Sequence, residues 1–226
     1  MPSEALSALL EATNEVDVLQ RANPSPTGAA PNNATLTSVI GRASVVLLSS
    51  HFERYNVSVI EELTEYVNHA DVAGTSLPVR LRLMHARSSI EDLARTSWDN
   101  RQDKIVEFLN SDAPLWNGHS VRSLSAERIL SLSSPMPEQL IKLYRLWDIQ
   151  DIFAAITRTA HTKHDLFWKL QSLVDKRNAI AHGTVEIQAT QADIRQYTEA
   201  VKTFCVRVDR LLAGQIGRLC GTVRLW

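Results

Sequence analysis

An arginine, an asparagine and a histidine at the end of one apolar-patterned segment are residue types that can act on a phosphodiester. The segment Leu173-Val-Asp-Lys-Arg-Asn-Ala-Ile-Ala-His-Gly183 contains Arg177, Asn178 and His182. An imidazole, whose ordinary pKa is ~6.5, can take a proton at neutral pH, and a guanidinium can hold two phosphate oxygens. RNA carries its own nucleophile, the 2′-hydroxyl. These residues therefore suit RNA cleavage that leaves a 2′,3′-cyclic phosphate and a 5′-hydroxyl, with no metal and no cofactor required.

The spacing leaves two ways of bringing these side chains together. Asp175, Asn178 and His182 are three and four residues apart, so they share one face of a helix. Arg177 precedes His182 by five residues, which turns an ideal helix by about 140°. Either the arginine reaches round while the helix end at Gly183 re-aims the histidine, or the two residues meet across a symmetric dimer. Asn178, one turn from His182, is placed to bind the imidazole or the phosphate.

Each of these residues also has an ordinary structural interpretation. His182 could cap the carboxyl end of a helix, where the helix dipole favours a cation. Arg177 could be a surface arginine, and Asp175 and Lys176 could form a solvated face. Elsewhere, His161 and His164 lie three residues apart, but no third ligand follows at a metal-binding spacing, so we expect no metal site.

Helices must position these residues, because the helical period dominates the apolar pattern. The predicted helices are Ser3–Arg21, Thr35–Ala70, Val79–Trp98, Lys104–Leu109, Ser123–Leu132, Glu138–Thr159 (one helix or two in series), Lys163–Ala181 and Gln191–Leu212. The prolines of residues 23–33 predict a loop, and residues 110–119 predict an irregular connector. We expect one all-α domain over residues 1–226, with a long second helix and an irregular central insertion at about 81–137. Residues 1–33 would form a helix plus a Pro-rich loop, and residues 214–226 a tail that is a strand or a docked extension.

Composition limits the classes of function. A formal net charge of -1 gives no global basic field, so RNA binding would need a local patch. Cys205 and Cys220 are not in zinc-finger spacing, which argues against a disulfide scaffold and a structural zinc site. The segment Met1-Pro-Ser-Glu4 has no basic region, and no apolar run reaches the ~18 residues of a membrane span. We therefore expect a cytoplasmic protein that does not enter a membrane.

Two segments resemble a known family. Arg177-Asn-Ala-Ile-Ala-His182 resembles the R-x-x-x-x-H signature of HEPN domains, including the polar residue after the arginine. Ala43-Ser-Val-Val-Leu-Leu-Ser-Ser-His-Phe-Glu-Arg-Tyr55 resembles the long second helix of the RiboL-PSP-HEPN-like branch. The resemblance implies an HEPN-like helical bundle. It also implies that Arg177 and His182 match the catalytic positions, that Asn178 matches the accessory polar position, and that Glu53 matches an acidic residue of the long helix.

The same resemblance implies a metal-independent endoribonuclease that acts as a homodimer with a composite active site. The branch suggests a toxin or antiphage-defence effector that cleaves RNA, with tRNA a candidate substrate, restrained by a cognate antitoxin, inhibitor or sensor protein. Lys176 and Arg54 are candidate RNA contacts, although each also fits an ordinary charged surface. The alternatives are a non-catalytic HEPN module for RNA binding or protein interaction within a defence complex, and an inhibited or regulatory subunit with a large exposed apolar patch. A cutting enzyme should expose Arg177 and His182 in one cleft, whereas a buried salt bridge would favour the module.

Overall fold

A computed structural model describes residues 1–23, 31–130, 134–184, 188–222 and 225–226. Within these residues the regular structure is helical, and the only pairing of β type is an isolated bridge between Ala73 and Ser120. The prediction of an all-α chain is thereby confirmed. The α-helices are α1 (Glu4–Arg21), α2 (Pro31–His69), α3 (Val79–Arg95), α4 (Trp98–Ser111), α5 (Ala126–Ile129), α6 (Pro137–Arg145), α7 (Ile152–Ile156), α8 (Ala160–Ala181) and α9 (Gln191–Leu219).

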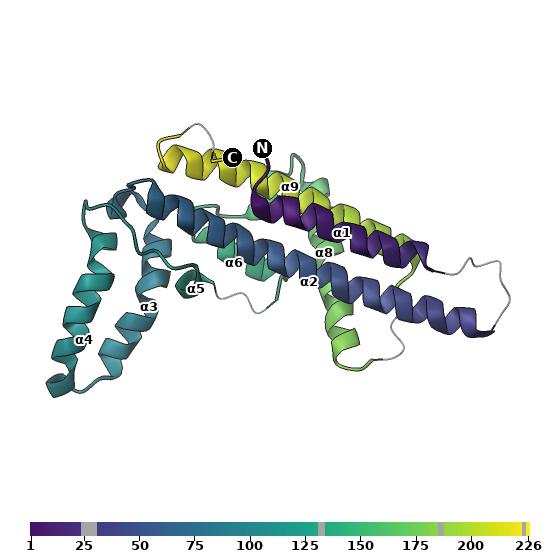
Figure 1. Ribbon diagram of the computed structural model, residues 1–226, viewed down its shortest axis with the longest axis horizontal. Helices are drawn as coiled ribbons and strands as arrows, with labels where there is room; N and C mark the ends of the chain where they lie inside the picture. The colour runs from purple at the N-terminus through teal and green to yellow at the C-terminus, as the bar shows by residue number, and fades with distance from the viewer. Residues whose placement is uncertain (24–30, 131–133, 185–187, 223–224) are drawn as a thin grey trace.

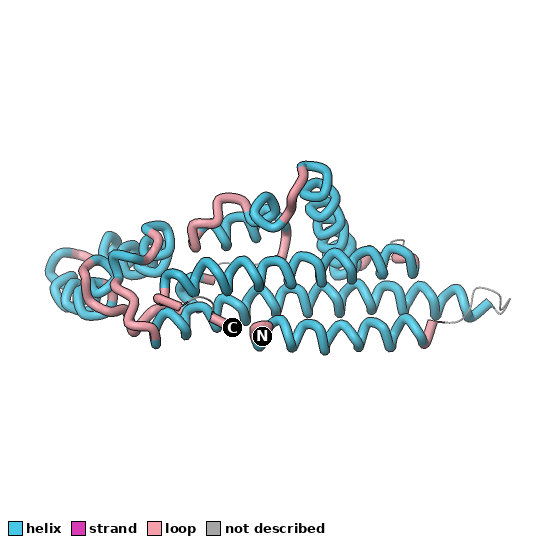
Figure 2. Tube along the Cα trace, turned by 90° about the horizontal axis from the view of Figure 1, so that it is seen from above, coloured by secondary structure: helices cyan, strands magenta, loops and turns pink. Residues whose placement is uncertain are grey.

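Three long helices, α1, α2 and α9, lie side by side along the molecule (Figures 1 and 2). One face of α2 is buried along its length, at Val45, Leu48, Phe52, Tyr55, Val59, Leu63 and Val67. These positions recur at three and four residues, which is why the sequence specifies a helix there. The ring of Phe204 on α9 lies 5.5 Å from Phe52 and 5.3 Å from Phe153 of α7. The aromatic cluster joins the short helix α7 to the long ones.

The two ends of the chain meet at a buried carboxylate. Asp209 of α9 accepts a hydrogen bond from the Ser3 hydroxyl and one of 2.9 Å from the Trp226 indole. Ser3 also caps α1, because its Oγ accepts from the Leu6 amide at 3.0 Å. Trp226 therefore docks on α9, and residues 223–224 lie outside the described part of the chain.

Several boundaries differ from the predicted ones. The last helix does not stop at Leu212 but continues through Gly214 to Leu219, because Ala213 and Ile216 bury their side chains in the core and outweigh the low helix propensity of glycine. The long helix begins at Pro31, inside the predicted loop, and proline suits a first helical turn. Residues 24–30 of that loop, and residues 131–132 at the end of the predicted Ser123–Leu132 helix, are outside the described residues.

The central insertion is more regular than predicted. Helices α3 and α4 form a hairpin that projects from one end of the bundle, and we call this hairpin the arm (Figure 1). At its base the fully buried Asp112 lies 3.1 Å from Nδ1 of His85 and 3.0 Å from Nη1 of Arg128 on α5. The predicted irregular connector at 110–119 contains the end of α4 and a 3-10 turn over Ala113–Trp116. In the described part of the chain, no helix combines the length and apolar character that crossing a membrane requires.

Candidate active site

The motif lies at the carboxyl end of α8, which is fixed at both ends. Thr159 and Thr162 form a capping box at its start. Its buried face carries Leu166, Leu170, Leu173 and Val174. At its end Gly183 has a φ of 83°, with its amide bonded to the Ile180 carbonyl at 3.1 Å and the Thr184 amide bonded to the Ala179 carbonyl at 3.0 Å. This is a Schellman motif, for which glycine is the favoured residue. The predicted stop at Gly183 is confirmed, and it makes His182 the capping residue.

Two oxygen-bearing side chains orient the Arg177 guanidinium. Its Nη1 donates to Asn178 Oδ1 at 3.0 Å, and its Nη2 lies 3.9 Å from Oε2 of Glu53 on α2. The side chains of Arg177 and Glu53 are 33% and 32% exposed, so this is a loose and partly solvated ion pair. The long helix and α8 thus meet at the arginine of the motif. Asn178 contacts Arg177 here, and no hydrogen bond to the imidazole is seen among the described residues.

His182 is exposed, and its imidazole forms no hydrogen bond or ion pair with any residue that the structure describes. Its backbone amide donates to the Asn178 carbonyl at 2.9 Å, and its φ of -81° and ψ of 7° keep it close to the helical path. The helix end therefore does not swing the residue round towards Arg177. The sequence predicted two ways to bring Arg177 and His182 together, within one subunit or across a dimer. The described part of the chain does not support the first, because the helix end does not turn the His182 side chain towards Arg177.

The charged residues near the motif differ in whether they have a hydrogen-bond or ion-pair partner among the described residues. Asp175 is exposed and accepts from Gln171 at 2.9 Å within α8. Lys176 pairs with Asp193 of α9 at 2.9 Å; partial burial opposes its charge, but hydrogen bonds to Asp193 and Tyr197 prevail and raise the pKa of the lysine. Lys176 therefore ties α8 to α9. Arg54 is exposed and pairs with no carboxylate among the described residues, so it remains the better-placed candidate for an RNA phosphate.

An open apolar groove of ≈ 600 Å³ borders the motif. It is lined by Leu19, Val39, Arg42, Ala43, Val46, Leu47, Ser50 and Ile180. Ser50 is one turn before Glu53, and Ile180 is one turn after Arg177, so the groove reaches the motif along both α2 and α8. Sequence reasoning missed this surface, because Val39 and Val46 follow the same helical period as the core positions although both are exposed.

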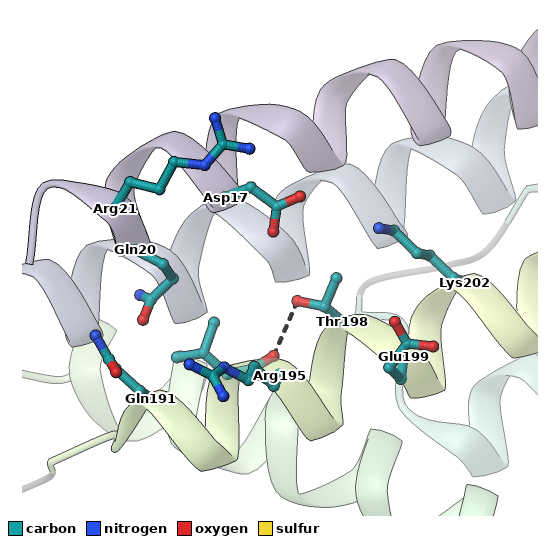
Figure 3. A pocket seen from close by; sticks show the side chains of 9 residues that line it. Asp17, Gln20, Arg21, Gln191, Arg195, Thr198, Glu199 and Lys202 are labelled. Carbon is teal, nitrogen blue, oxygen red and sulfur yellow. Dashed lines mark hydrogen bonds between the residues drawn. The ribbon is translucent and has the colours of Figure 1, made fainter.

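A second groove, of ≈ 370 Å³, lies between α1 and α9 (Figure 3). The side chains that line it are Asp17, Gln20, Arg21, Gln191, Ile194, Arg195, Thr198, Glu199 and Lys202. Its three cations are interleaved with two carboxylates, so its field is close to neutral. Asp193, two residues before Arg195, faces α8, and two residues turn a helix by about 200°, so this groove is on the side of α9 away from the motif.

His161 and His164, the two histidines three residues apart, are not accompanied by further metal-ligating side chains among the described residues. Nε2 of His164 accepts from the Trp168 indole at 2.7 Å, and His161 is exposed. Among residues 1–23, 31–130, 134–184, 188–222 and 225–226, no three His, Cys, Asp or Glu side chains come together as ligands for a metal ion.

Comparison with known proteins gives one match. No curated protein and no solved structure matches the chain. A family model described as RiboL-PSP-HEPN matches residues 7–214, which include Glu53, Arg177 and His182. HEPN domains are all-α and have ribonuclease or other RNA-related functions. Since the match spans most of the sequence, from α1 into α9, this chain belongs to the RiboL-PSP-HEPN family.

Proposed function

We propose that this chain is a metal-independent endoribonuclease in which Arg177 binds the scissile phosphate and His182 transfers protons. The observation that carries the proposal is the state of the two side chains at the end of α8. The Arg177 guanidinium is oriented by Asn178 and Glu53 but stays partly exposed, while His182 faces solvent without a partner among the described residues. Neither residue is locked in a buried salt bridge, which is the arrangement that would favour a purely structural motif.

The reaction follows from the chemistry of these groups. A neutral His182 accepts the proton of the 2′-hydroxyl as the 2′-oxygen attacks phosphorus. Arg177 donates to the non-bridging oxygens, whose negative charge grows in the pentacoordinate transition state. The bond from phosphorus to the 5′-oxygen breaks, and that oxygen takes a proton from an imidazolium. The His182 imidazolium formed by taking the 2′-hydroxyl proton supplies it, so one histidine serves each site. The products are a 2′,3′-cyclic phosphate and a 5′-hydroxyl.

The apolar groove beside the motif supports a homodimer. Val39 and Val46 expose their side chains to solvent along α2, and Ile180 extends the surface to α8. Covering such a surface with the same surface of a second copy removes apolar area from water and brings two motifs to one interface. Because the five-residue spacing directs Arg177 and His182 to different sides of one helix, a composite site joins the arginine of one subunit to the histidine of the other.

The biological setting that fits is a toxin or antiphage-defence effector in the cytoplasm, with tRNA among the candidate substrates and a cognate antitoxin, inhibitor or sensor as restraint. Membership of the family supports this setting. A second candidate function is a non-catalytic module that binds RNA or protein within a defence complex. The contact between Arg177 and Glu53 favours it, because a carboxylate at 3.9 Å competes with an incoming phosphate.

Cleavage of total RNA and of tRNA by the purified protein in excess EDTA tests the proposal. We expect the wild type to cut and both His182→Ala and Arg177→Ala to lose at least about 100-fold in rate, the range for removal of a proton-transfer or transition-state group. His161→Ala, an exposed histidine at the other end of α8, is the matched control and should cut normally. If wild type binds RNA without cutting it, the module is the right function. Equal cutting by all variants would place the activity in other residues.

A further inference from the structure

Helix α4 buries none of its residues, although it is 14 residues long. One side of it faces α3, where Lys104 pairs with Asp92 and where Ile105 and Phe108 are half-buried. The rest of the helix is on the outside of the projecting arm, away from the three long helices (Figures 1 and 2). A surface helix normally buries a continuous apolar stripe, so the uncovered part of α4 is unusual for a folded chain.

The uncovered part carries an apolar stripe of its own. Trp98 is 68% exposed, Val106 56% and Leu109 55%. Positions 98, 106 and 109 lie within about 80° of one another around the helix, and the polar Gln102 stands between Trp98 and Val106 on the same face. Beside Val106 there is a shallow hollow of ≈ 600 Å³ that Asp103 and Glu107 border. An exposed apolar stripe with an adjoining hollow is the shape that accepts apolar side chains from a partner.

The stripe is flanked by carboxylates that have no counter-ion. Asp99, Asp103 and Glu107 follow at intervals of four and form no ion pair with any residue in the described ranges. Of the two cations of α4, Lys104 pairs with Asp92, while Arg101 donates to the Thr96 carbonyl and lies 5.8 Å from the centroid of the Trp98 ring. The outer face of α4 therefore presents an apolar stripe with a negative edge. That edge repels the phosphates of RNA and attracts cationic side chains.

The arm holds this face in a defined place. At its base, Asp112 accepts hydrogen bonds from His85 and Arg128 and so links α3, the end of α4 and α5. A surface on a fixed helix loses less conformational entropy on binding than one on a loop.

We propose that the outer face of α4 docks a protein partner whose own surface is an apolar helix or groove edged by lysine and arginine side chains. The charge of the face selects this occupant. RNA is disfavoured by the carboxylates, and a second copy of the arm would bring an identical acidic edge. The proposal does not depend on cleavage by Arg177 and His182.

The test uses the full-length protein and a designed 18-residue amphipathic helical peptide, with leucines on one face and lysines and arginines at its edges. A matched peptide carries glutamates in place of the cations. Fluorescence anisotropy should show binding of the cationic peptide that weakens as salt rises, and no binding of the acidic one. Val106→Ser/Leu109→Ser, which changes only exposed side chains, should weaken binding at least about tenfold, the effect expected for the centre of an interface.

Three further variants make the result decisive. Asp99→Asn/Asp103→Asn/Glu107→Gln should remove most of the salt dependence together with the affinity. Val18→Ser on α1, an equally exposed valine outside the arm, and Arg177→Ala should bind like wild type. Failure to bind the cationic peptide, or equal binding by the Val106/Leu109 variant, overturns the proposal. So does a dimer in sedimentation analysis that Val106→Ser/Leu109→Ser converts to monomer, because the occupant is then a second copy.

Discussion

Arg177 carries a planar fork of donors that suits the two non-bridging oxygens of a phosphate, and this geometry predicts that lysine cannot fully replace it. Nη1 already donates to Asn178, and Nη2 lies on the side of Glu53, so two different donors of the guanidinium are directed at two oxygen-bearing side chains. A lysine ammonium is a single point charge and loses the second contact. We expect Arg177→Lys to lower the rate of RNA cleavage by roughly ten- to a hundredfold while the thermal unfolding temperature stays unchanged. Arg95→Lys, an exposed change on α3, serves as the control and should cut at the wild-type rate.

Glu53 gives a prediction of the opposite kind. Its carboxylate is 3.9 Å from Arg177 and about one-third exposed, so we propose that it is a weak positioning contact without a role in proton transfer. We expect Glu53→Gln to keep cleavage within about threefold of wild type and to change the free energy of unfolding by less than ~1 kcal/mol, as for other solvated ion pairs. Cleavage rates and urea denaturation measure the two effects. A loss of more than 100-fold with an intact fold would instead identify Glu53 as a catalytic group.

Residue types showed where chemistry could occur, but they did not show which groups touch. Arg177, Asn178 and His182 are close in the sequence, yet a hydrogen bond between side chains joins only the first two. The link to Glu53 depends on how α2 crosses α8, and no local pattern encodes that crossing. Lys176 illustrates the same limit. Its charge suggested an RNA contact, but its ammonium group forms a salt bridge with Asp193 of α9.

At the level of the helices, Gly183 and Gly214 allow a matched test of backbone conformation, because both have room for a Cβ. Gly183 ends α8 with a φ of 83°, and a Cβ there would meet nothing within 4 Å. Gly183→Ala should therefore destabilise the protein by about 1–2 kcal/mol, through backbone strain alone, and misplace His182. Gly214 has equal space but lies inside α9, so Gly214→Ala should stabilise by up to about 1 kcal/mol. Urea denaturation gives both values. If both substitutions changed the free energy of unfolding in the same direction, the left-handed cap at Gly183 would be contradicted.

The base of the arm should respond to pH through His85. Burial, and then the Arg128 charge, lower the pKa of His85, while its contact with Asp112 only partly offsets them. Folding therefore favours the neutral imidazole, and this contribution is complete above the unfolded pKa of ~6.5 and is lost as pH falls towards the lower folded value. Burial opposes the charge of Asp112, but a hydrogen bond from Ser89 and the Arg128 charge prevail and lower the pKa of Asp112, so it stays ionised throughout this range.

Hydrogen exchange measures this response. From pH 7 to pH 5, after correction for the intrinsic exchange rate, we expect amide protection to fall in α3, α4 and α5 before it falls in α2 and α9. His85→Gln cannot titrate and should remove the pH dependence even if it lowers overall protection. A pH-independent arm in the wild type would show that Asp112 and Arg128 hold it without any contribution from His85.

At the level of elements, the sequence predicted the helices better than it predicted their surroundings. The long helix, α8 and the start of α9 follow from apolar residues at three and four, and the cap follows from Gly183. The same spacing places Trp98, Val106 and Leu109 on one face of α4, where each side chain is more than half exposed. Periodicity identifies an apolar face, but only tertiary packing decides whether it becomes core or surface. The continuation of α9 beyond Leu212 has the same origin, since burial of Ile216 outweighs the local effect of Gly214 and Gly217.

For the whole molecule, the dimer is the assumption on which a composite active site depends, and it can be tested without knowing the natural substrate. Val46 lies in the apolar groove beside the motif, and Val46→Glu should convert a dimer to a monomer in sedimentation analysis. The charge would sit on the face of α2 that the second copy covers. Cleavage should be lost with the dimer, although Arg177 and His182 are unchanged. A monomeric variant that still cuts would mean that one chain holds a complete site.

Complementation between two inactive variants separates a composite site from two independent ones. A heterodimer of the Arg177→Ala and His182→Ala chains can be obtained by co-expression with two different tags. It contains one Arg177 side chain and one His182 side chain, each on a different subunit. If these residues work across the interface, one of the two sites is intact and about half of the wild-type activity returns. If each site lies within one chain, both sites in the heterodimer are broken and no activity returns. The five-residue spacing, the helical backbone at His182 and its solvent-facing imidazole favour the first outcome. Adding Val46→Glu to both chains should abolish the recovery, which links the restored activity to the groove.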